Sequence, residues 1–213
     1  AGADVAEINA WNHPVPPIVD ADALVVLGGS MSCQDDAEAP WLAPTRQLIA
    51  RTVKAGTPFL GICLGHQLAT VALGGQVCTS DHFCLGAAEM HLTPEGKKDP
   101  LLSVYDGHRG IHFNNDVAVV LPEDAVLLAR DPTGQIEAVR FAERAWGVQF
   151  HPECTPEIFD AWTIGHGEKE WQQRLPWSEA VTVAETVRRD IDTVNAEEAF
   201  AARFQELIDP EKR

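Results

Sequence analysis

Basic residues are scarce in this chain. Lys and Arg number 16 against 32 Asp and Glu, which gives a formal net charge of −16 at pH 7. Nucleic acids and anionic membrane surfaces are bound through clustered Lys and Arg, so we expect neither as a partner. The simplest interpretation of the excess acid is a solvated surface, and the alternative is a docking face for a basic partner protein.

Long apolar runs and paired cysteines are also missing. No apolar run approaches the ~20 residues that a helix needs to cross a bilayer, so we do not expect an integral membrane protein. The cysteines are odd in number and lack CxxC spacing: Cys33, Cys63, Cys78, Cys84 and Cys154. This pattern fits neither a disulfide framework nor a zinc site, and it favours the reducing cytoplasm. Other ligand spacings are absent too, so we expect no metal site among His82, Cys84, His91, His108 and His112.

The first half of the chain alternates short apolar runs with helical patterns. Residues 23–27 form a continuous apolar run that ends at two glycines, which is typical of a strand buried on both faces. A helix is predicted over 41–55, a second buried strand over 58–62 and a helix over 65–73. Strand, helix, strand, helix in this order predicts a parallel α/β sheet.

The middle of the chain has a different pattern. Short β-type runs at 117–120, 126–129 and 136–141 are separated by Pro, Asp and Gly turn residues, which favour antiparallel connections. A last strand is predicted at 146–150, and helical spacing follows, with Trp162, Trp171 and Trp177 expected to be packing residues. No linker or repeat interrupts residues 1–213, so we expect a single domain.

The start of the chain is unusual for such a sheet. A doubly wound sheet places its first strand centrally, yet only a weak strand candidate, residues 5–8, precedes the run at 23–27. Either this short run begins the sheet, or an earlier strand and helix are missing. We expect the native polypeptide to be longer at its N-terminus, because a central strand cannot be removed from a parallel sheet without leaving backbone groups unpaired.

The segment Gly61-Ile62-Cys63-Leu64-Gly65-His66-Gln67 joins a predicted strand to a predicted helix. It has the form G-x-C-x-G, a thiol version of the nucleophile elbow, in which a sharp turn presents the nucleophile. The turn places Cys63 at a helix N-terminus, where the dipole and free N–H groups stabilise a thiolate. The competing interpretation is a structural cysteine buried at a tight turn.

A second motif closes the last predicted strand. In Gly147-Val148-Gln149-Phe150-His151-Pro152-Glu153, an i, i+2 pair lets the carboxylate of Glu153 orient the imidazole of His151. An oriented base that reaches a thiol is the general arrangement of an activated nucleophile. Taken alone, the pair could equally be a surface His and Glu at a turn.

Together these two motifs resemble those of the class I (triad) glutamine amidotransferases, and most closely the stand-alone members similar to the glutaminase domain of GMP synthase. The resemblance runs from about residue 23 to residue 153, and it includes the glycine-rich loop Leu27-Gly28-Gly29-Ser30-Met31-Ser32. It implies a flavodoxin-like three-layer α/β fold, with a central mostly parallel sheet and some antiparallel late strands.

The resemblance also implies a reaction: hydrolysis of the side-chain amide of L-glutamine through a cysteinyl thioester. Cys63 would be the nucleophile, His151 the base and Glu153 its partner. Oxyanion and substrate contacts would come from Gly28, Gly29, Leu64 and Gln67. No metal or organic cofactor is implied, and the ammonia would pass to a separate synthase.

One departure from the family leaves other functions open. Relatives carry a His-containing segment (W-H-G-D or S-H-G-D) where this chain has Asn114-Asn115-Asp116, with Asn114 in the place of that His. The first alternative is a hydrolase of γ-glutamyl amides or peptides that uses the same triad. The second is a non-catalytic regulatory protein on the same fold.

Overall fold

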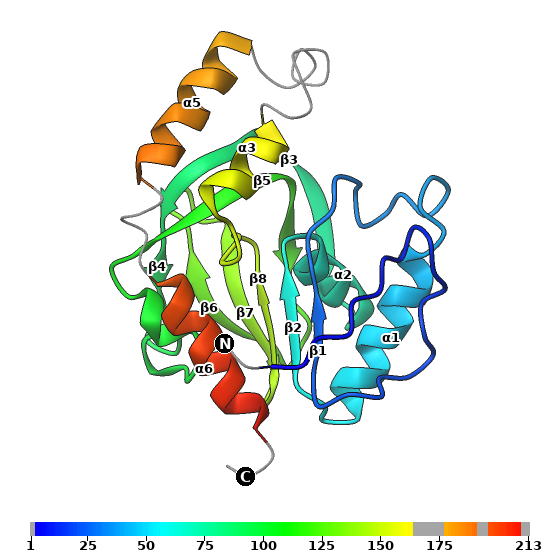
Figure 1. Cartoon of the computed structure of the whole chain (residues 1–213). Helices are drawn as coiled ribbons and strands as arrows, with labels where there is room; N and C mark the ends of the chain where they lie inside the picture. The colour runs from blue at the N-terminus through cyan, green and yellow to red at the C-terminus, as the bar shows by residue number, and fades with distance from the viewer. Residues whose placement is uncertain (1–2, 164–176, 191–195, 210–213) are drawn as a thin grey trace.

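A computed structural model of the chain describes residues 3–163, 177–190 and 196–209 (Figure 1). A six-stranded sheet has the order β1-β2-β8-β7-β6-β4. Its parallel part consists of β1 (Leu24–Val26), β2 (Phe59–Ile62) and β8 (Ala145–Val148). An antiparallel part follows: β7 (Ile136–Ala142), β6 (Val126–Arg130) and β4 (His91–Leu92). The expected α/β fold with antiparallel late strands is therefore confirmed.

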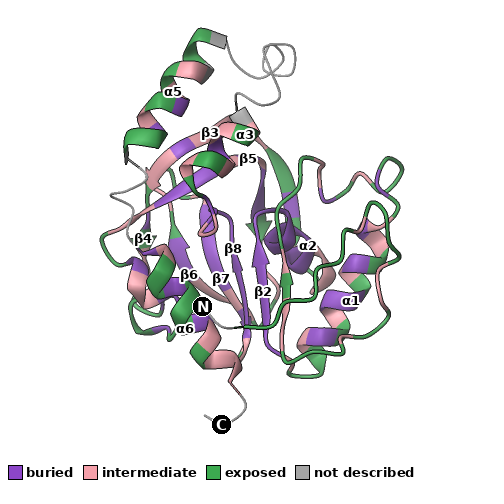
Figure 2. Ribbon diagram, viewed as in Figure 1, coloured by how far each residue is buried: buried purple, intermediate pink, exposed green. Residues whose placement is uncertain are grey.

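Helices cover both faces of this sheet. On one face lie α1 (Leu42–Lys54) and α2 (Leu64–Ala72), and on the other lies α6 (Glu197–Ile208), as Figure 1 shows. In α1 the buried positions Leu42, Thr45, Leu48, Ile49 and Thr52 follow helical spacing, so one face points to the core (Figure 2). In α6, the side chains of Phe200 and Phe204 are buried in the core on the opposite face of the sheet. Two short 3₁₀ helices, Gly96–Lys98 and Leu102–Tyr105, precede β5.

A second, two-stranded sheet pairs β3 (Gln76–Glu89) with β5 (Arg109–Val120). The strand expected at 117–120 is only the end of β5, because the polar residues before it do not form an apolar run. Their side chains are nevertheless buried, including His112, Asn114 and Asp116. Polar contacts made across the fold stabilise this strand, and sequence periodicity does not reveal such contacts. Between β8 and α6 the described residues form α3 (Pro156–Thr163) and α5 (Trp177–Asp190), which pack together, and α5 lies against β3.

The first half of the chain agrees closely with its expected elements. The ends of β1, α1, β2 and α2 each lie within one residue of the predicted bounds. Residues 5–8, by contrast, do not form a strand, so that interpretation is wrong. Val5 and Ile8 are 78% and 52% exposed, and among the described residues β1 is one of the two edge strands of the sheet. The apolar side chains of residues 5–8 are therefore not sufficient to make this segment pair with the sheet.

Some expectations lie beyond these observations. None of the described helices is long and apolar enough to cross a membrane. Trp171 falls outside the described residues, as do parts of the helical stretch expected after residue 150. That the native polypeptide extends further at its N-terminus stays a prediction.

Candidate active site

Cys63 sits in a strained turn between β2 and α2. Its φ of 51° and ψ of −106° fall in a region that side-chain-bearing residues rarely adopt, and it is the one non-glycine residue with positive φ in the described part of the chain. Its N–H donates to the carbonyl of Val148 at 2.8 Å, which ties the turn to β8. Strain of this kind persists only where the surrounding structure enforces it, and it is concentrated at functional sites. The predicted elbow is present.

Two glycines make this turn possible. A Cβ on Gly65 would lie 2.1 Å from the carbonyl oxygen of Val26, and a Cβ on Gly61 would lie 2.6 Å from the backbone of Gly65. Both distances are far inside van der Waals contact, so neither position accepts a side chain without backbone movement. The close approach of α2 to β1 and β2 therefore explains the G-x-C-x-G spacing.

Parallel pairing brings the second motif beside Cys63. Ile62 of β2 is in register with Val148 of β8, so the residues after each strand emerge at the same edge of the sheet. His151 follows there, with its N–H bonded to the carbonyl of Ile111 at 2.8 Å. Its Nδ1 lies 2.7 Å from Oε1 of Glu153. A Cβ on Gly28 would lie 3.0 Å from Cε1 of His151 and 3.5 Å from Cβ of Cys63, so this loop glycine is next to both.

The surroundings of His151 favour its charged form. Burial lowers the pKa of this imidazole, but its interactions with Cys63 and the carboxylate of Glu153 outweigh burial and raise the pKa to about 10. Nε2 makes no hydrogen bond of ordinary geometry to any described residue. A loose contact of this kind is common in pairs of nucleophile and base, and it tightens in the transition state. The arrangement can supply an imidazolium next to Cys63.

The glycine-rich loop 27–32 is fixed by the carboxylate of Asp116. Ser32 Oγ donates to Asp116 Oδ2 at 2.5 Å, and Thr79 Oγ1 donates to Asp116 Oδ1 at 2.9 Å. Gly29 in this loop packs against Leu64, the first residue of α2. The N–H groups in the first turn of a helix have no intrahelical acceptor, so Leu64 offers a free donor beside Cys63.

A cavity of about 280 Å³ opens beside Cys63. Gly29, Gln67 and Asn114 line it, and so do the carboxylate-bearing residues Asp35 and Asp116. None of the described residues that line it is Lys or Arg. The cavity therefore combines a candidate nucleophile with a wall that favours positively charged groups.

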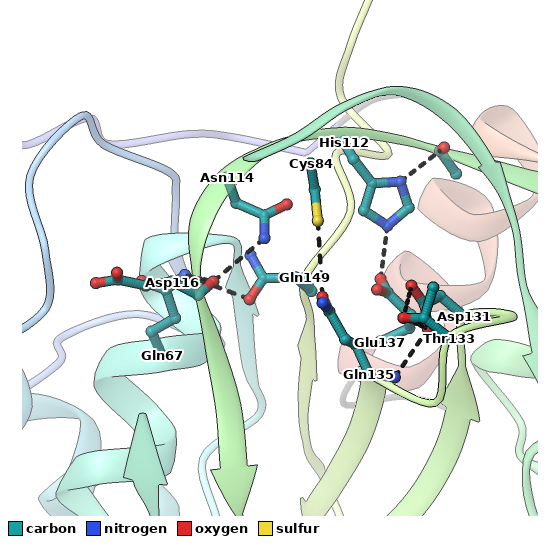
Figure 3. A network of polar contacts seen from close by, with 11 residues as sticks. Gln67, Cys84, His112, Asn114, Asp116, Asp131, Thr133, Gln135, Glu137 and Gln149 are labelled. Carbon is teal, nitrogen blue, oxygen red and sulfur yellow. Dashed lines mark hydrogen bonds and ion pairs between the residues drawn. The ribbon is translucent and has the colours of Figure 1, made fainter. Parts of the chain in front are cut away.

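The amides at the back of this cavity are ordered by one backbone carbonyl (Figure 3). Gln67 Nε2 donates to the carbonyl of Asp116 at 2.8 Å and contacts Oε1 of Gln149 at 3.3 Å. Asn114 Nδ2 donates to the same carbonyl at 3.2 Å. Asn114 Oδ1 is buried without a hydrogen-bond partner among the described residues. The residue itself is one of those that line the cavity.

Two contacts near the site are not indicated by any pattern in the sequence. His112 and Glu137 form a buried ion pair, with Nε2 2.6 Å from Oε2. His112 is therefore in contact with Glu137. The described residues contain no group of three or more His, Cys, Asp or Glu side chains that could hold a metal ion. The indole of Trp162 lies with its ring centre 4.6 Å from that of His151. No spacing signal connects either pair, because the partners come from different elements of the fold.

Known proteins resemble this chain over most of its length. The profile of the family described as Glutamine amidotransferase class-I matches residues 4–165. YfeJ of Salmonella typhimurium, a glutamine amidotransferase-like protein, is 32% identical over 73% of this chain and 66% of its own length. One of the subunits of the glutamine-hydrolysing GMP synthase of Methanothermobacter thermautotrophicus is 30% identical over 66% of this chain and 70% of its own length. The GMP synthase of Tolumonas auensis is 29% identical and is matched over only 38% of its length.

Solved structures share the fold. The crystal structure of SMU.1228c has a TM-score of 0.81 at 26% identity, covering 98% of this chain and 90% of that one. A glutamine amidotransferase from Thermotoga maritima has a TM-score of 0.71 at 21% identity, covering 87% and 78%. At that identity the second likeness speaks for the fold alone. The chain spans about two thirds of YfeJ and far less of the full-length GMP synthase.

Proposed function

Because the chain belongs to the class I glutamine amidotransferase family, we propose that it hydrolyses the side-chain amide of L-glutamine to glutamate and ammonia. One observation carries this proposal. The strained Cys63 lies at the same sheet edge as the hydrogen-bonded pair His151 and Glu153. A nucleophile, a base and a group that orients the base are the parts that acyl transfer requires.

The reaction follows from these positions in two halves. The Cys63 thiolate attacks the carboxamide carbon, and His151 gives its proton to the leaving nitrogen, which departs as ammonia. The γ-glutamyl thioester left on Cys63 is then attacked by water, with His151 accepting the proton and the thiolate leaving. Glu153 holds Nδ1 of His151 throughout and stabilises the imidazolium form.

The oxyanion formed in both halves needs donors beside Cys63. The N–H of Leu64, at the start of α2, and the N–H of Gly29 in the facing loop are suited to this role. Gly28 leaves the space that His151 and Cys63 need to approach each other. Gln67 lies deeper in the cavity and fixes the wall against which the substrate rests.

The cavity wall suits the α-ammonium group of glutamine. The carboxylates of Asp35 and Asp116 favour a cation. The same wall is the observation that favours the second candidate, a hydrolase of γ-glutamyl amides whose amine part is cationic. The two reactions share the triad and differ in the leaving group.

The fate of the ammonia is part of the proposal. Two of the relatives are a glutamine-hydrolysing GMP synthase and one component of such an enzyme, and this chain is similar to only part of the full-length enzyme. We infer that residues 1–213 act as a glutaminase unit and that a separate synthase accepts the ammonia. The excess of acidic residues is compatible with a basic docking face on that partner.

The test is release of glutamate and ammonia from L-glutamine by the wild type and by Cys63→Ala. Activity that the substitution abolishes supports the glutaminase; activity on γ-glutamyl amines with none on glutamine supports the second candidate. If neither is turned over, covalent labelling of Cys63 by a glutamine-like electrophile separates a partner-dependent enzyme from a non-catalytic protein. No labelling at Cys63 would overturn the proposal.

A further inference from the structure

The mechanism above makes no use of Trp162, which lies against its base. The ring centres of Trp162 and His151 are 4.6 Å apart, and the ring planes meet at 58°. On the other side, the indole is 6.0 Å from the ring of Phe113, a residue that lines the cavity. Trp162 thus forms part of the wall between the cavity and α3, and it is half-buried.

The position of Trp162 depends on the docking of α3. Phe159 of the same helix is fully buried in a cluster with Ile111 of β5 and Val187 of α5. On the outer side, Asp160 Oδ1 accepts two bonds from the Arg188 guanidinium, with Nε at 2.9 Å and Nη2 at 2.5 Å. α5 therefore holds α3, and α3 holds the indole against His151.

We propose that Trp162 is a positioning residue for His151: contact with its indole fixes the plane of the imidazole and stabilises its protonated form. An aromatic ring attracts a cation within about 6 Å of its centre through its quadrupole, and Trp does so most strongly. Neutral imidazole gains no such attraction, so the contact selects for imidazolium. The role rests on the proposed function, in which His151 must carry and return a proton.

Within the described ranges, few other charged groups lie around His151. Cys63 from the elbow and Glu153 from its own segment act on the ring. On α3, Glu157 is exposed and Asp160 is paired with Arg188 of α5. On α6, Glu197 acts on Cys154 and Tyr105, which are buried near Glu153. None of these charges replaces a contact on the face of the ring, so the contribution of Trp162 can be separated from theirs.

The experiment measures the pKa of His151 directly, by NMR of protein labelled with ¹³C in its histidine rings. It uses Cys63→Ala as the background, because Cys63 is the strongest of the influences that raise the pKa of His151, and its loss brings the titration to lower pH. His151→Gln in the same background assigns the signal. Trp162→Leu keeps an apolar shield but loses the aromatic face, whereas Trp162→Phe keeps a weaker face.

We expect Trp162→Leu to lower the pKa of His151 by on the order of one unit, and Trp162→Phe to lower it by less. Val187→Ala is the matched control. It removes methyl groups from a buried residue that packs on α3 and leaves the indole in place, so it should reduce stability without moving this pKa. An unchanged pKa in folded Trp162→Leu, or an equal shift in the Val187 variant, would overturn the inference.

Activity then separates this inference from the proposed function. In the Cys63-containing protein, Trp162→Leu should lower kcat for glutamine by about tenfold with little change in KM, and Trp162→Phe should restore most of it. A pKa shift without any glutaminase activity supports the role of Trp162 and counts against the proposed reaction. Normal activity of Trp162→Leu together with an unshifted pKa of His151 supports the proposed reaction and counts against the role of Trp162.

Discussion

His112 of β5 and Glu137 of β7 form an ion pair that joins the two sheets of the molecule. Nε2 and Oε2 are 2.6 Å apart, and both side chains are almost fully buried. Nδ1 of His112 is 3.0 Å from the carbonyl of Gly110, to which it can only donate. The neighbouring carbonyl of Ile111 accepts the N–H of His151, and the carbonyl of Glu137 accepts the N–H of Gln149. The pair thus holds the two strands that support the His151 segment.

Removing one partner of this pair should be costly. We expect Glu137→Ala to lower the free energy of unfolding by about 3–5 kcal/mol, because a buried His112 is left without its partner. Glu137→Gln keeps a hydrogen-bonding group and should cost less than half of that. Urea unfolding of the three proteins measures the difference. Equal losses of unfolding free energy in Glu137→Ala and Glu137→Gln would contradict a stabilising role for the contact between His112 and Glu137.

The turn at Cys63 leads to a second prediction. Gly65→Ala places a Cβ 2.1 Å from the carbonyl oxygen of Val26 and should unfold the protein or shift α2 away from β1. Gly56→Ala is the control. Gly56 has a positive φ of 74° but no atom within 4 Å of the added Cβ, so only about 1 kcal/mol of backbone strain is expected. Comparable melting temperatures for Gly65→Ala and Gly56→Ala would show that the fold does not require the close approach of Gly65 to the backbone of Val26.

The sequence predicts the elbow and the closing motif well, because each is a local pattern at the end of a buried strand. It also predicts that Cys63 and His151 meet, since the carboxyl ends of parallel strands share one edge. It predicts only the end of β5 and not its first part, where buried polar residues replace an apolar run. It cannot predict the contact of Trp162 with His151, because the docking of α3 depends on packing by α5. Contacts between elements are set by tertiary packing, which carries no periodicity.

The free oxygen of Asn114 gives a third prediction. Its Oδ1 is buried and without a partner among the described residues, and the residue lines the cavity, so a turn of the amide would let it accept a hydrogen bond from the substrate. Under the proposed function, Asn114→Ala should raise KM for glutamine by about tenfold and leave kcat within about threefold. Steady-state kinetics at fixed pH measure both. A fall in kcat with unchanged KM would assign Asn114 to the chemical step instead.

The last prediction concerns acid stability and His66. This side chain of α2 is fully buried against Phe141, and neither ring nitrogen has a hydrogen-bond partner among the described residues. Burial lowers its pKa from 6.5 to about 4. Above pH 6.5 neither the folded nor the unfolded form binds this proton, so His66 adds no pH dependence there. Between pH 6.5 and 4 the unfolded chain takes up a proton that the folded chain refuses, and stability falls by up to about 3 kcal/mol.

His66→Leu should remove this loss, because leucine does not titrate. Its free energy of unfolding, measured in urea at about pH 7.5, 6 and 5, should decline less steeply with falling pH than that of the wild type. His91→Ala is the control, since His91 is 63% exposed and its removal should leave the slope unchanged. Parallel declines in the wild type and His66→Leu would mean that another group, and not His66, takes up the proton on unfolding. A reduced slope in the leucine variant alone would identify His66 as the residue that limits stability in acid.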